Sequence, residues 1–307
     1  MRKGLRTFIL MFMSFFVAYT AAAETRIRLS GEEHITLNLS SAENDNPVFE
    51  RYCVWLEQAE QLEREWSVKL QMPDGGMVLK PSGHGSTDVP FEFQVQQQTG
   101  GPISEVRPES LVAEGSALTS HCRNETGAFL IRVLPTKSFE LIPGGTYRQN
   151  LKLKLNVQGL DPVLTEIPVT LRVAHQVAAS LSHSELTLPR FDGQQSPVAV
   201  ADLCLFRNGG GQYVVRLQGE GEGSSFALKR SRGNNETLPY NVHWRSGGQI
   251  GESLQPGQAS RLYSGSSFRD CRGGSNASLQ ITVPAEEAQK AMSGHYQDSL
   301  RITVQAR

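Results

Sequence analysis

The chain has 307 residues, and its 30 Lys and Arg residues nearly balance its 31 Asp and Glu residues, which gives a formal net charge of −1. This balance gives no support to nucleic-acid binding or to a polybasic membrane-binding surface. The length is enough for two domains of ordinary size.

The first segment, residues 1–23, has the three-part pattern of a secretory signal peptide. Basic residues stand at positions 2, 3 and 6, an apolar run covers residues 8–18, and small residues occupy positions 21–23. The apolar run is too short to span a bilayer comfortably, and no later segment approaches such a span. We therefore expect the mature chain to begin near Glu24.

The region 24–173 reads as short strands separated by turn sequences such as "PDGG" and "SGHGS", which is typical of an antiparallel β-sandwich. Residues 24–34 are expected to form its opening strand. The stretch "LKLKLNV" (151–157) alternates apolar and polar residues, as a strand with one buried face does. By contrast, "WLEQAEQLEREW" (55–66) has the pattern of a helix or of a long excursion.

Within this region the apolar run Met77, Val78 and Leu79 lies between a "PDGG" turn and a "PSGHG" turn, where a sandwich would project a hairpin tip. Exposed apolar patches on secreted domains mark contact sites. One interpretation is therefore an adhesive tip at the far end of the first domain. The other is an ordinary buried strand.

The region closes with "VLTEIPVTLRV" (163–173), in which every second residue from 163 to 173 falls on one face. This pattern predicts a further strand. Pro168 indicates an edge position, because a proline has no N–H to offer to a neighbouring strand.

The remaining region, 174–307, repeats the order of the first at an offset of about 150 residues. The corresponding pairs are "CVW" at 53 and "CLF" at 204, "WSVKLQ" (66–71) and "YVVRLQ" (213–218), and "GTYRQNLKLKL" (145–155) and "GHYQDSLRITV" (294–304). This common order predicts one unit written twice. Two unrelated β-domains that match by chance are the alternative.

The four cysteines support the duplication. Cys53 and Cys122 are 69 positions apart, and Cys204 and Cys271 are 67 apart. Exported chains form disulfides by default, so we predict one bridge within each copy, Cys53–Cys122 and Cys204–Cys271.

The second copy is expected to contain a short helix at 284–292 and to finish with a strand that carries Leu300, Ile302 and Val304 on its inner face. The sequence then stops, so the second copy has no counterpart of residues 163–173. An unpaired strand edge beside an apolar groove needs a partner. These three residues are therefore our candidates for a groove that receives a strand from another protein, and a domain that covers its own edge with a loop is the alternative.

No motif points to catalysis. The seven histidines have no HxxxH or CxxC partner, and the chain has no GxSxG elbow and no phosphate-binding loop. We expect no enzymatic activity, no cofactor and no metal site.

The bridged unit that ends in "SGHYQDSLRITV" (293–304) resembles subunits of chaperone-usher pili, and it is most similar to the archaic branch, whose domains are related to spore coat protein U. The match includes Cys204 and Cys271, and in the first copy Cys53, Cys122 and "GGTYRQNLKLKL" (144–155). The first copy departs from the motif at Gln149 and Asn150. Two such domains in one chain resemble the two-domain tip adhesins of those pili.

The resemblance implies two tandem immunoglobulin-like β-sandwich domains, the second lacking its final strand. A periplasmic chaperone, and then an adjacent pilus subunit, would supply that strand by donor-strand complementation. The N-terminal domain (24–173) would bind a host or abiotic surface ligand, and the pilin-like C-terminal domain (174–307) would anchor the chain after passage through the periplasm and the outer-membrane usher. Residues 24–34 look like an opening strand and not like a donor extension, which favours the fimbrium tip at the cell surface.

Three other functions are weighed against this one. A structural or initiator minor pilin would have no receptor of its own. An exported hydrolase would need a catalytic constellation that the sequence does not offer. A two-domain periplasmic chaperone fits poorly with duplicated, bridged units.

Overall fold

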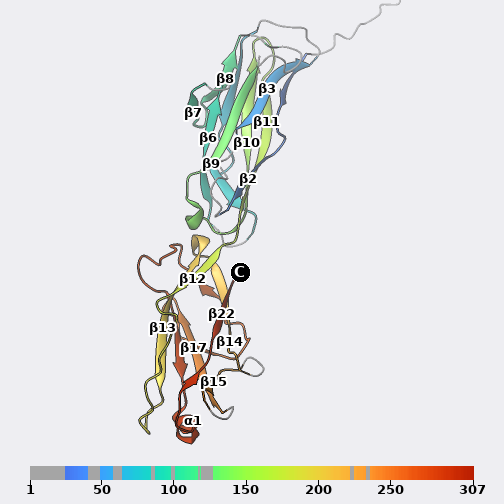
Figure 1. Ribbon diagram of the computed structural model, residues 1–307. Coiled ribbons are helices and arrows are strands. Elements are labelled where there is room, and N and C mark those ends of the chain that lie inside the picture. The colour runs from blue at the N-terminus through green and yellow to red at the C-terminus, as the bar shows by residue number, and fades with distance from the viewer. Residues whose placement is uncertain are drawn as a thin grey trace, which may run out of the picture.

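The computed structural model describes residues 25–40, 49–57, 64–83, 87–97, 101–116, 118, 127–221, 225–232 and 236–307. The predicted signal peptide lies outside these residues. The described chain is nearly all β, as the sequence predicts, and it forms several sheets packed as β-sandwiches. Figure 1 shows two bodies stacked end to end, which we call the N-terminal body (25–173) and the C-terminal body (177–307). In the described part of the chain, no helix is long and apolar enough to cross a membrane.

The N-terminal body is a sandwich of two layers. One layer has the strand order β1-β3-β9-β6 with β7 beside β6, the other has the order β8-β4-β10-β11-β2, and β5 pairs with both β6 and β10 and so joins the layers. Its elements are β1 (Arg26–Ser30), β2 (Ile35–Leu39), β3 (Glu50–Glu57), β4 (Trp66–Gln71), β5 (Val78–Pro81), β6 (Val89–Gln96), β7 (Ile103–Glu105), β8 (Leu111–Gly115), β9 (Ala128–Pro135), the 3-10 turn η1 (Phe139–Leu141), β10 (Gly145–Val157) and β11 (Val163–Val173).

Alternation along the strands builds the core between these layers. In β6, "VPFEFQVQ", each buried residue is followed by a half-buried one, so Phe91 and Phe93 point inward while Glu92 and Gln94 point outward. The second half of β10 follows the same rule. This period of two matches the geometry of a pleated strand with one face on the core.

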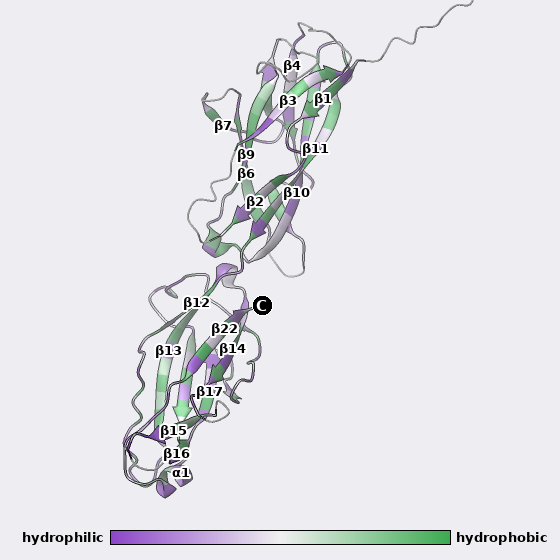
Figure 2. Ribbon diagram, turned by 45° about the vertical axis from the view of Figure 1, so that its right-hand side comes forward, coloured by the Kyte–Doolittle hydropathy of each residue, from purple (hydrophilic) through white to green (hydrophobic). Residues whose placement is uncertain are grey.

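The C-terminal body has a five-stranded sheet, β12-β13-β20-β17-β18, which faces a three-stranded sheet, β19-β14-β22, and a small sheet, β16-β15-β21. Its elements are β12 (Val177–Leu181), β13 (Val198–Arg207), the 3-10 turn η2 (Asn208–Gly210), β14 (Gln212–Gln218), β15 (Ala227–Arg230), β16 (Thr237–Pro239), β17 (Asn241–Ser246), β18 (Glu252–Leu254), β19 (Tyr263–Ser264), β20 (Ala277–Thr282), α1 (Ala285–Lys290), β21 (Tyr296–Gln297) and β22 (Arg301–Ala306). In Figure 2 the apolar residues concentrate along the strands of both bodies.

The strand registers support the predicted duplication. Leu153 of β10 lies opposite Leu70 of β4, and Ile302 of β22 lies opposite Leu217 of β14. The same correspondence joins β1 with β12, β3 with β13, β5 with β15, β6 with β16 and β17, β7 with β18, β8 with β19, β9 with β20, and β10 with β21 and β22. Among the described strands of the N-terminal body, β2 and β11 have no counterpart strand in the C-terminal body.

Of the two helices expected from sequence, one is confirmed. Helix α1 lies within the expected range 284–292. For the segment 55–66, which the sequence reads as a helix or a long excursion, the helix is wrong at both described ends, because β3 continues to Glu57 and β4 begins at Trp66; residues 58–63 lie outside the described part of the chain. Pairing of β3 with β1 along five residues outweighs the local helical preference of this charged segment.

The two bodies meet where η1 and η2 touch, and a buried asparagine ties them together. The Nδ2 group of Asn208 donates to the carbonyl oxygen of Ile142 at 2.9 Å and to that of Ala174 at 3.0 Å. Its Oδ1 atom accepts from the backbone N–H of Gln176 at 3.0 Å. The side chain is fully buried, so these bonds fix the end of the N-terminal body against the start of the C-terminal body.

Replacement of Asn208 by Ala is expected to destabilise this joint by about 1–3 kcal/mol, because two carbonyls and one N–H lose their partner in a buried place. Chemical denaturation measures the loss, and small-angle X-ray scattering should show a broader distribution of angles between the bodies. The exposed Asn241, which makes no side-chain hydrogen bond within the described residues, provides the matched Ala control. Equal behaviour of the two variants would contradict the role of Asn208.

Candidate functional site on the C-terminal strand

Strand β22 has one paired edge and one open edge. Residues 301–306 pair with β14 along its length, and no described strand pairs with the opposite edge. Strand β12 lies close to β22 in space, as Figure 2 shows, but the two belong to different sheets and are not hydrogen-bonded to each other. Backbone N–H and C=O groups that point away from β14 are therefore available to an incoming strand.

The N-terminal body shows how this edge is completed. There β10, the counterpart of β21 and β22, pairs with β11 from Gly145 opposite Val173 to Leu155 opposite Val163. Strand β11 pairs in turn with β2 in parallel. As predicted, the alternate residues of β11 face the core, with those from 167 to 173 fully buried. Pro168 lies just before the segment that pairs with β2, so its missing N–H costs no ladder bond there.

Side chains on β10, which is covered by β11, are more buried than their counterparts on and beside β22. In β10, Leu151, Leu153 and Leu155 are each 0% exposed. Their counterparts Leu300, Ile302 and Val304 are only partly buried, although they pack against the C-terminal core. The three residues predicted to line the groove are therefore brought together along one face and left partly uncovered.

A second feature of this region was not singled out from sequence. In the N-terminal body Ile35 and Leu37 of β2 are buried beside β11. Their counterparts Leu186 and Leu188 form no strand and are partly buried. The correspondence between "ITLNL" and "LTLPR" is visible in the sequence. It indicates that Leu186 and Leu188 lie beside the open edge only when the position of β11 is known. An incoming strand in the position of β11 would lie between β22 and this segment.

The loop between β21 and β22 is held by Asp298, a residue of the C-terminal motif. Its Oδ2 atom accepts from the Tyr240 hydroxyl at 2.6 Å, and its Oδ1 atom accepts from the backbone N–H of Glu220 at 3.1 Å. Burial, together with this carboxylate, raises the pKa of the Tyr240 hydroxyl well above its usual range. The pairing of Lys80 with Arg148 and of Lys229 with Gln297 makes Gln149 the counterpart of Asp298.

One disulfide lies within the C-terminal body. Cys204 and Cys271 are bonded as predicted, with their Cα atoms 5.7 Å apart, which is within the usual range. Cys53 is also disulfide-bonded. Cys122 lies outside the described residues, so the bridge Cys53–Cys122 stays a prediction.

Of the two interpretations of Met77, Val78 and Leu79, the strand is observed and the exposed adhesive tip is wrong on two counts. Leu79 is 0% exposed, and Met77 packs against the core. Strand β5 also lies toward the joint and not at the far end, since Pro81 pairs with Tyr147, whose hydroxyl donates to Pro143 beside η2. A short apolar run between two turns fits a core-crossing strand as well as a hairpin tip, and here the pairing with β6 and β10 buries it.

The described residues contain no group of three or more His, Cys, Asp or Glu side chains placed to hold a metal ion. The open edge of β22 instead offers backbone hydrogen-bonding groups, with partly buried apolar side chains on the same strand. Such an arrangement can bind an extended peptide.

No protein-family model matches the chain, and no curated protein matches its sequence. Several solved structures are similar over most of its length. One is the complex of the chaperone CsuC with the tip subunit CsuE from archaic chaperone-usher Csu pili of Acinetobacter baumannii, at 12% identity and a TM-score of 0.39, covering 90% of this chain and 99% of that one.

Two further similar structures are adhesins. A mutant of the CFA/I adhesin CfaE from enterotoxigenic Escherichia coli is 14% identical with a TM-score of 0.45, covering 89% of this chain and 92% of that one. The CupB6 tip adhesin from Pseudomonas aeruginosa is 7% identical with a TM-score of 0.35, covering 91% and 93%. These structures are of pilus adhesins and not of enzymes, and the likeness to each is distant.

Proposed function

We propose that the C-terminal body accepts a β-strand from another protein along the open edge of β22, and that the chain is the tip adhesin of a chaperone-usher pilus. One observation carries the proposal. At the place where the N-terminal body has β11, the C-terminal body has an unpaired strand edge beside the partly uncovered side chains of Leu300, Ile302 and Val304.

Such an edge is unfavourable in isolation, because it exposes backbone hydrogen-bonding groups and apolar surface that promote aggregation. Strand addition relieves both problems: the main chain supplies affinity, and alternate side chains that enter the groove supply specificity. If the resemblance of "SGHYQDSLRITV" to pilus subunits holds, the donors are a periplasmic chaperone during export and then an adjacent subunit delivered at the outer-membrane usher.

We assign the binding role to the N-terminal domain, residues 24–173, and the anchoring role to the C-terminal domain, residues 174–307. The N-terminal body contains β11 and β2 and so completes its own sheet, which leaves it free to present a surface to a ligand. This division would place the protein at the fimbrium tip, on the cell surface. A structural or initiator minor pilin is the second candidate, and it would share the groove but lack the ligand.

The groove is tested with a labelled peptide that has the sequence of β11, VLTEIPVTLRV. We expect the mature chain to bind this peptide, and the double variant Ile302→Asp, Val304→Asp to lose about a hundredfold in affinity, because two carboxylates would have to be buried beneath the added strand. Fluorescence anisotropy measures the binding.

The charge-matched control is Thr303→Asp with Gln305→Asp, since both side chains lie on the outer face of the same strand. This control should bind the peptide as the parent does. A parent chain that stays monomeric, melts sharply and ignores the peptide would contradict strand acceptance.

A further inference from the structure

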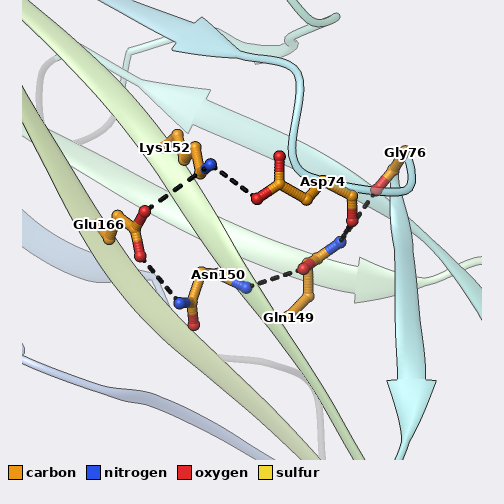
Figure 3. Close-up of polar contacts among 6 residues, drawn as sticks. All are labelled: Asp74, Gly76, Gln149, Asn150, Lys152 and Glu166. Atoms are coloured by element: carbon orange, nitrogen blue, oxygen red, sulfur yellow. Dashed lines mark hydrogen bonds and ion pairs between the residues drawn. The ribbon is translucent and has the colours of Figure 1, made fainter.

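In the N-terminal body, the outer face of the layer β8-β4-β10-β11-β2 contains a shallow hollow of about 260 Å³. Arg148, Gln149, Asn150 and Lys152 of β10 line it, together with Asp74 and Glu166. As Figure 3 shows, Lys152 lies between the two carboxylates, with its Nζ atom 2.8 Å from Asp74 and 3.8 Å from Glu166.

The hollow exists because the hydrogen-bond ladder is interrupted. On this side, β10 pairs with β5 at residues 147–148 and with β4 from residue 152 onward, so residues 149–151 have no partner strand there. Gln149 closes the gap by donating from Nε2 to the carbonyl oxygens of Asp74 and Gly76, at 3.0 and 3.2 Å. Its Oε1 atom accepts from the backbone N–H of Asn150, and the Asn150 amide donates to Glu166 at 2.9 Å (Figure 3). These hydrogen bonds orient the polar groups around the hollow.

Around the hollow, cations face one another across strands. Arg148 lies directly opposite Lys80, and Lys154 lies directly opposite Lys69. Within the described residues none of these four side chains has a hydrogen bond or an ion pair, although the charge of Lys80 attracts Asp74 at longer range. Like charges directly opposite each other destabilise a sheet. The fold therefore tolerates two unfavourable pairs on one face.

The C-terminal body shows that the fold does not require them. At the position of Arg148 opposite Lys80 it has Gln297 opposite Lys229. At the position of Lys154 opposite Lys69 it has Thr303 opposite Arg216. Thus, in the same register, each pair of like charges in the N-terminal copy is replaced in the C-terminal copy by one charged residue opposite one neutral residue.

We propose that this face, centred on Arg148 and Lys80 beside the hollow, binds an anionic saccharide that carries sulfate or carboxylate groups. The guanidinium of Arg148 suits a planar, bidentate contact with such a group, and the Lys80 ammonium adds charge beside it. The amide of Asn150 and the carboxylates of Asp74 and Glu166 offer the donors and acceptors that sugar hydroxyls need.

The two carboxylates also distinguish a saccharide from an anionic membrane. The hydrogen bond to Lys152 holds the pKa of Asp74 below its usual range, so this carboxylate keeps its charge to a lower pH than an ordinary aspartate does. A membrane of anionic lipids presents negative groups to the whole face, including Asp74 and Glu166, whereas a saccharide can place its anionic group at Arg148 and donate hydrogen bonds from its hydroxyls to these two carboxylates. This inference rests on the proposed role of the N-terminal domain as the binding domain, and it does not depend on strand acceptance by β22.

The test uses the full mature chain with heparin as a sulfated probe, polygalacturonate as a carboxylated probe and neutral dextran as the reference. The double variant Arg148→Gln, Lys154→Thr introduces the residue types found at the corresponding positions of the C-terminal copy. It should therefore fold normally, and because two like-charge pairs are removed, it should melt at or slightly above the temperature of the parent. Calorimetry or surface plasmon resonance should show that it loses heparin binding by about tenfold or more, since it gives up a charge-assisted contact.

The control Arg51→Gln, Arg245→Gln removes two exposed charges, one on β3 in the other layer of the N-terminal body and one on β17 of the C-terminal body, and should keep parental binding. The inference is overturned if the parent binds dextran as well as it binds the anionic polymers or binds none of them, if the two double variants behave alike, or if phosphatidylserine vesicles bind better than heparin. Binding of the β11 peptide is measured on the same preparations, so failure of the saccharide site is separated from failure of the strand-accepting groove.

Discussion

Fusing a copy of residues 158–173 directly after Ala306, in place of Arg307, is expected to stabilise the C-terminal body by about 3 kcal/mol or more and to raise its melting temperature by roughly 10 °C. The register supports this design. Val157, the last residue of β10, corresponds to Ala306, the last residue of β22. The copied segment would therefore turn back as it does in the N-terminal body.

The expected gain has two sources. Copies of Ile167, Val169 and Leu171 would move from water into the groove, where full burial of an aliphatic side chain contributes about 1.5–3 kcal/mol. The appended strand would also cover Leu300 and its neighbours and satisfy the open backbone edge. Part of this gain offsets the entropy lost when the new segment becomes ordered, which is why the net value is smaller than the sum.

Differential scanning calorimetry measures the melting temperature, and hydrogen exchange read on peptides from β14 and β22 locates the protection. The matched control carries the same extension with the copies of Ile167, Val169 and Leu171 changed to Asn. Stabilisation by both extensions, or by neither, would show that β22 does not present a groove of the β11 type.

Much of this fold can be predicted from the sequence because its signals are local. Alternation along β10 and β11 gives their strands and their buried faces, and the repeated order of segments gives the correspondence between the two bodies. The position of Cys204 relative to Cys271 gives their bridge, as observed. The candidate groove residues follow from the same alternation, since Leu300, Ile302 and Val304 are inward positions of a strand whose counterpart is covered.

The parts that could not be predicted depend on long-range pairing. The run at Met77 reads equally well as a loop tip or a strand, and only its contacts with β6 and β10 decide the matter. Residues 55–57 carry a helical pattern, yet pairing with β1 makes them part of β3. The hollow beside Arg148 arises where β4 and β5 leave part of β10 unpaired, and no local pattern marks such a gap.

Substitutions at corresponding positions of the two bodies should change the free energy of unfolding by very different amounts. Leu153→Ala removes a fully buried side chain and is expected to destabilise the N-terminal body by about 3–4 kcal/mol, within the usual range for such a cavity. Ile302→Ala at the corresponding position is expected to cost about 1 kcal/mol or less in the unmodified chain, because its side chain is only partly buried. Denaturant-dependent hydrogen exchange, read separately on peptides of the two bodies, measures both values.

The appended strand should remove this difference. Once residues 158–173 are copied after Ala306, Ile302 becomes covered as Leu153 is, so Ile302→Ala should then cost about 2–4 kcal/mol. The increase is a coupling free energy between Ile302 and the added strand, and a double-mutant cycle isolates it from general effects of the extension. A cost for Ile302→Ala that is already large in the unmodified chain would mean that the groove is covered without a donor, and an unchanged small cost in the extended chain would mean that the donor does not lie over Ile302.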